Sequence, residues 1–397
     1  MAVNLTRESN FYIGLMSGTS IDGVDVALVD FKDNRCELID TYLHPISNDM
    51  RTKLIDLTTP KVSSSSTALV NRIEQLAELD VIMGNVFADS VNTALGSFNK
   101  KAEQIIAIGS HGQTIRHRAE YQHPFSLQIG DPSIIAEKTQ IKTIADFRRM
   151  DIAAGGQGAP LAPAFHQAVL RTERQNRIIL NLGGIANITI LAQDPKIEVT
   201  GFDTGPANAL LDAWFTLHHP KAVHRFDKNS EFANQGVVQS ELLTRFLGDD
   251  YFTLAPPKST GKEYFNLDWL QHNLNQCQQQ YSAADIQRTL LQLTVNTIAD
   301  AIKAASVQFS PNSPVSVLCC GGGMHNKLLL TLLQQRLAQA NKKVSVGQTN
   351  DVGIDGDYLE AMTFAWLAKQ RVEMLPGNLP SVTGASRPKI LGAEYLW

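Results

Sequence analysis

Two short stretches of the chain carry the same arrangement of apolar and polar positions. Residues 11–15 predict a buried strand, residues 17–22 a polar turn, and residues 24–29 a second strand. The arrangement recurs at residues 177–191, where one apolar run enters a glycine-containing turn and another apolar run leaves it. Two hairpins with one pattern indicate that the chain is a diverged duplication.

Helical spacing is present in each half of the chain. Residues 67–95 and 287–308 carry apolar positions three and four apart, which predicts two long helices. Residues 315–320 form a further apolar run that ends in glycines and predicts a strand. Strands that alternate with helices favour α/β layers over a helical bundle or a β-sandwich.

The length of 397 residues exceeds one compact core and, at about 150 residues per domain, indicates two domains with a cleft between them. We expect the crossing at residues 151–163, which are rich in small residues, with an ordinary loop as the alternative. The 43% of hydrophobic and 19% of charged residues exclude long disorder and a coiled coil. A net charge of −4 argues against nucleic acid or an anionic membrane as the partner and favours a small molecule.

The cysteines and the apolar runs indicate the compartment. Four cysteines in a chain of this size cannot form a disulfide framework, and Cys319 and Cys320 are adjacent in an apolar run. Arg7 and Glu8 precede the first apolar stretch, so no signal peptide is expected. No run approaches the ~20 apolar residues of a membrane-spanning helix. We expect a soluble, cytoplasmic protein with reduced thiols.

Several familiar motifs fail on spacing. Gly261 and Lys262 resemble the end of a phosphate loop, but Pro256 and Glu263 stand where that motif needs glycine and a hydroxyl residue. Residues 156–161 begin like a dinucleotide fingerprint and lack its third glycine. A solvated loop is favoured over a zinc site for three clustered histidines: His218, His219 and His224.

Three glycine-rich segments lie where predicted strands end or turn: residues 14–23, 182–187 and 321–323. Glycine lets backbone amides approach an anion, so two hairpin turns can grip a polyphosphate from opposite sides. Asp22 or Asp25 suits a hydrated magnesium ion, which takes one or two carboxylates. Any single loop is explained by tight turns alone, whereas three at strand ends favour phosphate binding.

Asp203 is the first candidate for a catalytic base. Residues 201–206 precede a predicted helix, which places Asp203 at the positive end of that helix, where a carboxylate stays ionised. A simple capping aspartate is the alternative. The sequence leaves both roles open.

Other polar candidates surround predicted strand and helix ends. His111 follows an apolar strand at residues 105–108, although a lone histidine is more often structural. Arg148 suits a ligand carboxylate or phosphate, with surface solvation as the default. Glu360 lies in a predicted helix at residues 358–369, either as a ligand to a polar substrate or as a solvent-facing residue. The alanines of that helix form a stripe suited to close packing against another helix.

Seven motifs, in order along essentially the whole chain, resemble those of the bacterial anhydro-N-acetylmuramic acid kinases. They are GLMSGTSIDGVD at 14–25, GSHGQTIRH at 109–117, DFRR at 146–149, AAGGQGAPL at 153–161, NLGGIAN at 181–187, GFDTGP at 201–206 and CGGG at 320–323. The resemblance implies the sugar kinase, heat-shock ATPase and actin (ribonuclease H-like) fold, in which two related α/β lobes hold ATP in the inter-lobe cleft. We assign residues 1–152 and 380–397 to the first lobe and residues 153–379 to the second.

The resemblance also implies a reaction. ATP, with Mg²⁺, converts 1,6-anhydro-N-acetylmuramic acid to N-acetylmuramic acid 6-phosphate while water opens the anhydro bridge. Such a transferase serves peptidoglycan recycling and amino-sugar catabolism in the cytoplasm. Its partner is the small-molecule sugar, with neither nucleic acid nor membrane, and a homodimer stays open.

Site residues follow from the same resemblance. Asp203 matches the base that activates water, and Arg148 and Glu360 match the sugar pocket, where we also place His111. Residues that match the nucleotide loops are Gly18, Thr19, Ser20, Ile21, Asp22, Gly23, Val24, Asp25, Gly183, Gly184, Gly321, Gly322 and Gly323. Two rival functions remain. One is a non-catalytic ATP-driven clamp that needs no base at Asp203, and the other is a kinase for an ordinary open hexose.

Overall fold

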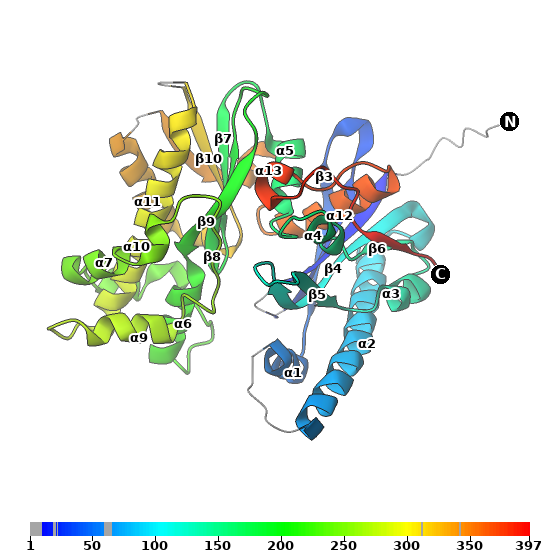
Figure 1. The fold of residues 1–397 in the computed structure, drawn as a ribbon, viewed down its shortest axis with the longest axis horizontal. Helices are drawn as coiled ribbons and strands as arrows, with labels where there is room; N and C mark the ends of the chain where they lie inside the picture. Colours follow the sequence, from blue (N-terminus) through cyan, green and yellow to red (C-terminus); the bar gives the residue numbers. More distant parts are fainter. Residues whose placement is uncertain (1–9, 19–20, 22, 59–65, 311–312, 341–342) are drawn as a thin grey trace. The chain divides into compact units, whose positions relative to one another are not determined.

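The chain forms two compact units, each with its own mixed α/β fold and its own sheet (Figure 1). The computed structural model describes residues 10–18, 21, 23–58, 66–310, 313–340 and 343–397. Unit 1 contains Met1–Phe165 and Tyr358–Trp397, and unit 2 contains His166–Asp357. The predicted α/β class is therefore confirmed.

The unit 1 sheet is built around the predicted first hairpin. Its strands have the order β12-β6-β4-β1-β2-β3, with β5 paired to β4. β1 is antiparallel to β2 and parallel to β4, while β2 is antiparallel to β3 and β4 is parallel to β6. The strands are β1 (Phe11–Ser17), β2 (Gly23–Asp30), β3 (Glu37–Pro45), β4 (Ile105–Arg118), β5 (Phe125–Ile129), β6 (Thr143–Ala145) and β12 (Ala393–Tyr395).

The unit 2 sheet repeats this topology. Its strands have the order β11-β10-β7-β8-β9, with β7, β8 and β9 as an antiparallel meander and β10 and β11 added in parallel beside β7. The strands are β7 (Asn176–Leu182), β8 (Ile185–Leu191), β9 (Thr200–Pro206), β10 (Val315–Cys320) and β11 (Val344–Gln348). In both units a meander is followed by two parallel strands beside its first strand, which is the topology that a duplication leaves.

Helices cover both sheets. The two long helices predicted from the apolar spacing are present as α2 and α10. Before and within unit 2 the helices are α1 (Asn48–Thr58), α2 (Ser66–Ser97), α3 (Pro132–Thr139), α4 (Arg149–Ala153), α5 (Ala162–Leu170), α6 (Asn208–His218), α7 (Ser240–Leu247), α8 (Asp250–Thr253), α9 (Leu267–Asn275), α10 (Ala283–Ala305) and α11 (Lys327–Ala340). After it come α12 (Leu359–Val372) and α13 (Pro380–Thr383). In the part of the chain that the structure describes, no helix is long and apolar enough to cross a membrane.

Two glycines let α12 lie directly on the unit 1 sheet. A Cβ on Gly14 of β1 would overlap the carbonyl oxygen of Ala361, and a Cβ on Gly109 of β4 would overlap that of Phe364. The helix is confirmed, but its packing partner differs from the expected second helix. The small residues of α12 face strands because glycines on those strands leave room for the helix backbone.

The compact units have other bounds than the lobes expected from the sequence. Residues 153–165 and 358–379 lie in unit 1. The buried carboxylate of Asp151 accepts hydrogen bonds from the Gly158 amide (2.7 Å), Asn378 Nδ2 (2.5 Å) and Thr383 Oγ1 (2.7 Å). These bonds attach both segments to α4, because a buried carboxylate needs its donors. No local pattern in the sequence reports such long-range bonds.

Candidate functional site

A buried serine, Ser17, ends β1 at the segment predicted to bind phosphate. The Ser17 hydroxyl donates to Gln113 Oε1 at 2.7 Å and also lies 3.3 Å from the Gly23 carbonyl oxygen. The Ile21 amide donates to the Gly18 carbonyl at 3.3 Å, and Ile21 adopts a φ of 53°. These contacts involve the described residues Ser17, Gly18, Ile21 and Gly23 of the segment that the sequence analysis assigned to phosphate binding.

The other residues of this predicted loop differ in environment. Val24 is fully buried in the core of unit 1. Asp25 is half-buried in β2 opposite Met16 of β1. Thr19, Ser20 and Asp22 lie outside the described residues.

His111 lies inside a strand rather than at a strand end. β4 continues from Ile105 to Arg118 because its second half pairs with β5, which corrects the shorter strand expected at residues 105–108. His111 Nε2 is 2.9 Å from a guanidinium nitrogen of Arg148, and its ring lies 4.7 Å from that of Phe364. Burial, and then the charge of Arg148, lower the pKa of His111 to about 3. The imidazole is therefore neutral at pH 7.

Arg148 lies near the other two predicted sugar contacts, His111 and Glu360, within unit 1. It precedes α4, donates to the Gly158 carbonyl at 2.8 Å and contacts His111. Burial lowers its pKa to about 10, and the charges of Glu360 and Asp151 oppose that effect. Glu360 is exposed in the first turn of α12. The fold thus gathers His111, Arg148 and Glu360 from β4, the start of α4 and α12, whose sequence positions are far apart.

Asp203 lies in unit 2, within β9. Its amide donates to the Lys258 carbonyl at 3.1 Å, and its Oδ2 accepts from the Thr260 amide at 2.9 Å. Tyr251 donates its hydroxyl to the Asp203 carbonyl at 2.8 Å. Desolvation raises the pKa of this carboxyl to about 6, the Thr260 amide opposes the shift and the charge of Glu263 adds to it. A half-buried carboxylate with this pKa is suited to proton transfer near neutral pH.

The helix expected after residues 201–206 is confirmed as α6, but Asp203 does not lie at its N-terminal end. Residues 200–206 form β9, and α6 begins only at Asn208. The residue before α6 is Ala207, which supplies no side-chain cap. Neither a helix dipole nor a capping role therefore explains Asp203. Pairing with β8 instead places Asp203 within strand β9.

The other two glycine segments lie close together at the carboxyl ends of β7 and β10 in the unit 2 sheet. β7 and β10 are parallel neighbours, and Cys320 stands opposite Asn181 in their register. A Cβ on Gly323 would lie 2.6 Å from the Cβ of Leu182. The turn at Gly183 and Gly184 and the segment Gly321–Gly323 are thus brought together, as a shared nucleotide site requires.

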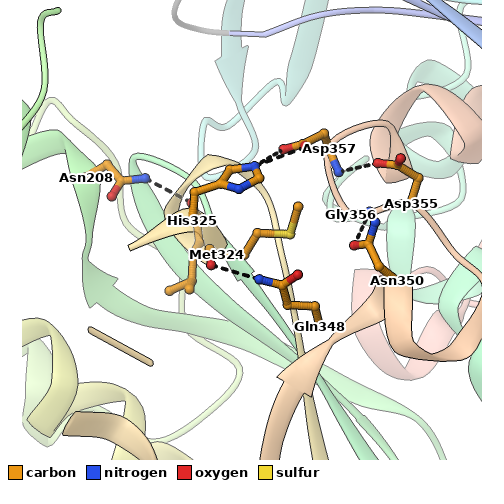
Figure 2. Close-up of polar contacts among 9 residues, drawn as sticks. Asn208, Met324, His325, Gln348, Asn350, Asp355, Gly356 and Asp357 are labelled. Carbon is orange, nitrogen blue, oxygen red and sulfur yellow. Dashed lines mark hydrogen bonds and ion pairs between the residues drawn. The ribbon is translucent and has the colours of Figure 1, made fainter. Parts of the chain in front are cut away.

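Polar contacts surround the segment after β10, as Figure 2 shows. His325 Nε2 lies 2.9 Å from Asp357 Oδ1, and Gln348 Nε2 donates to the Met324 carbonyl at 3.1 Å. The Gly321 amide donates to the Gly356 carbonyl at 2.9 Å. The sequence analysis missed this group because its members are distant in sequence and match no short motif.

The segment at residues 256–262 was also missed as a functional element. It failed the phosphate-loop spacing, and that rejection stands because no helix begins directly at Lys262; the next helix, α9, begins at Leu267. Its backbone nevertheless holds Asp203, through Lys258 and Thr260. The signal available in the sequence was a Gly-Lys pair with a threonine before it, which has little specificity without the fold.

Comparisons with known protein families and curated sequences identify the same family that the sequence motifs resemble. A family model described as "Anhydro-N-acetylmuramic acid kinase" matches residues 10–396. Curated proteins of that name from Coxiella burnetii and Xylella fastidiosa are each 48% identical to this chain, over 384 and 387 residues; the aligned residues cover 97% of this chain and 97% and 96% of those proteins. A solved ROK family glucokinase from Streptomyces griseus is 12% identical with a TM-score of 0.38, covering 91% of this chain and 99% of that one. A TM-score this low says nothing about the site.

Proposed function

The chain belongs to the anhydro-N-acetylmuramic acid kinase family, and from this premise we propose that it hydrolyses and phosphorylates 1,6-anhydro-N-acetylmuramic acid in one reaction with ATP. The chain is a kinase, so ATP is the phosphoryl donor. The product would be N-acetylmuramic acid 6-phosphate, together with ADP. This reaction would belong to peptidoglycan recycling and amino-sugar catabolism.

The setting of Asp203 supports this proposal most directly. In the proposed reaction the Asp203 carboxylate accepts a proton from water while the water oxygen bonds to the anomeric carbon. The bond from that carbon to the bridging 6-oxygen breaks, and the 6-oxygen bonds to the γ-phosphorus as the bond to ADP breaks. Because the Thr260 amide occupies Oδ2 at 2.9 Å, Oδ1 is the oxygen expected to take the proton.

We assign the sugar to the unit 1 group of His111, Arg148 and Glu360. The guanidinium of Arg148 stays charged at neutral pH with a pKa of about 10, so it can pair with the carboxylate of the sugar acid. His111 is buried and neutral, and its Nε2 lies 2.9 Å from the Arg148 guanidinium, so its proposed role is to orient that group toward the sugar. Glu360 is exposed and can accept from a sugar hydroxyl.

We assign ATP to the glycine segments that match the nucleotide loops of the family. Mg²⁺ takes few protein ligands and is usually carried on substrate phosphates with one or two carboxylates. Among the described residues no group of three or more His, Cys, Asp or Glu side chains could hold a metal ion. Of the two carboxylates predicted for such an ion, Asp25 is half-buried in β2 and Asp22 lies outside the described residues. The ion would screen the phosphate charge.

Oxygen-18 water tests the hydrolytic step. Turnover in labelled water should place the label on the anomeric hydroxyl, because that oxygen comes from water. Mass spectrometry at early times measures the label, and unlabelled product incubated in the same water controls for later anomeric exchange. An unlabelled anomeric hydroxyl would instead favour the rival kinase for an open hexose. Comparing ATP turnover with anhydro-N-acetylmuramic acid and with N-acetylglucosamine tests the same choice independently.

The pH dependence of kcat/KM should report the Asp203 carboxyl. The base must be ionised and its pKa is about 6, so kcat/KM should rise from pH 5 to pH 7 with a midpoint near 6. Below the midpoint the protonated carboxyl cannot accept the proton of water. Initial rates at saturating Mg²⁺ measure this profile. A profile that is flat from pH 5 to pH 7 would contradict the assigned role.

Location and assembly complete the proposal. We place the protein in the cytoplasm, where ATP is available, and all four cysteines are free thiols in the structure. A homodimer remains a prediction, and a measured mass in solution decides it.

A further inference from the structure

The segment that holds Asp203 is anchored on both sides of Gly261. Before it, the Lys258 carbonyl and the Thr260 amide bond to the backbone and side chain of Asp203. After it, the Gly261 carbonyl accepts from the amides of Tyr264 and Phe265, at 3.1 and 3.0 Å. Lys262 stands between these anchors, so the position of its backbone is fixed by the same bonds that orient Asp203.

The Lys262 side chain extends to the turn between β7 and β8. A Cβ built on Gly184 would lie 2.7 Å from Lys262 Cε and 3.6 Å from Nζ. The side chain is exposed, and its ammonium group forms no hydrogen bond or ion pair within 4.0 Å with any residue that the structure describes. Glycine at position 184 thus gives the lysine room to cross the turn, and its charge faces solvent there.

The backbone of the turn also presents a donor at this place. The amides of Ala207, Asn208 and Ala209 at the start of α6 donate to the carbonyls of Gly183 and Gly184, at 3.0 to 3.1 Å. In a trans peptide the N–H points opposite to the C=O. The Gly184 amide therefore points away from α6, and it has no acceptor among the described residues.

The nearby carboxylate does not neutralise the lysine fully. Desolvation raises the pKa of Asp212 on α6 to about 7, and Lys262 opposes that shift. Asp212 is thus only partly ionised at neutral pH. An ammonium group and a free amide beside one glycine turn form a site for an anion with several oxygens.

We propose that Lys262 binds the phosphates of ATP at the Gly183–Gly184 turn, together with the Gly184 amide. This inference rests on the proposed kinase function and adds a residue that positions the phosphoryl group. Residues 258–262 carry both Lys262 and the backbone groups that bond to Asp203. The same segment of backbone therefore positions the phosphate contact relative to the base.

The test compares three variants with the wild type. Lys262→Met should weaken ATP binding and raise the KM for ATP by about tenfold to hundredfold, the effect of a lost charged hydrogen bond. The affinity for adenosine and the KM for the anhydro-sugar should stay unchanged. Lys262→Arg should retain most of the ATP affinity. Lys196→Met is the matched control, an exposed lysine in the loop between β8 and β9, at the other end of β8 from the turn.

Calorimetric titration with ATP and with adenosine measures the contrast without any turnover. Equal ATP affinity of Lys262→Met and wild type would overturn the proposal, as would a change in the KM for the sugar instead of ATP. Intact adenosine binding shows that the variant is folded. If the wild type shows no sugar-dependent ATP turnover, the proposed function is wrong. The difference in ATP affinity between wild type and Lys262→Met would still decide whether Lys262 binds the phosphates.

Discussion

Replacement of Asp203 by asparagine should lower kcat about 1,000-fold, which is within the range that a general base contributes. The amide cannot accept the proton of the attacking water. The Thr260 amide can still donate to the oxygen of the new side chain, so the local fold should persist. The KM for ATP should change little, because the residue contacts the water and not the nucleotide.

Steady-state kinetics with anhydro-N-acetylmuramic acid measures this effect. Asp194→Asn is the matched control, since Asp194 is an exposed aspartate in the loop after β8 of the same unit. An unchanged turnover rate in Asp203→Asn would remove Asp203 from the role of base. That result would favour the rival function, a non-catalytic ATP-driven clamp, which needs the glycine turns but no base at Asp203.

Replacement of Gly14 by alanine should cost about 3 kcal/mol of stability, at the upper end of ordinary overpacking. The new methyl group would overlap the carbonyl oxygen of Ala361, and the Ala365 amide nitrogen is also close, at 2.8 Å. Neither atom belongs to a flexible side chain, so α12 as a whole must move away from β1. The contacts of α12 with β1 and β4 are lost together in that case.

Urea unfolding followed by circular dichroism measures the loss. Gly96→Ala is the control, because a Cβ at Gly96 in the exposed end of α2 meets nothing within 4 Å. That change should alter stability by no more than about 1 kcal/mol, in the stabilising direction. If Gly14→Ala unfolds at the same urea concentration as the wild type, the close seating of α12 on β1 is contradicted.

Local patterns predicted the elements that have one buried face. The hairpin of β1 and β2, the hairpin of β7 and β8 and the helices α2 and α10 all lie where the apolar spacing placed them. The duplication also followed from the sequence, since each hairpin carries its own pattern. Its proof needed the paired sheets, because strand order depends on contacts between distant segments.

The sequence misled where pairing prevails over local propensity. Asp203 was expected at the N-terminal end of a helix, but pairing with β8 places it within β9, and α6 begins only at Asn208. The strand at His111 runs on because β5 pairs with it. Desolvation in the strand raises the pKa of Asp203, whereas the expected position at a helix N-terminus would have lowered it.

Residues that act through tertiary contacts had no signal of their own. Asp151 is a buried hub whose donors lie more than 200 residues away at Asn378 and Thr383. The Lys262 side chain lies beside Gly184, which is 78 positions earlier in the chain. Only the resemblance to a family could single out Arg148 and Glu360 before the fold showed them near each other.

The seating of α12 and β12 in unit 1 has a consequence for the order of synthesis. Unit 1 begins the chain, but its helix on Gly14 and Gly109 and its edge strand come from the last forty residues, Tyr358–Trp397. The ribosome therefore releases every residue of unit 2 before it supplies the end of unit 1. Domains fold as units when their chain is complete. Unit 2 should therefore be the first to reach its native state, although most of unit 1 is translated before it. The glycines of β1 and β4 stay uncovered until α12 has been synthesised.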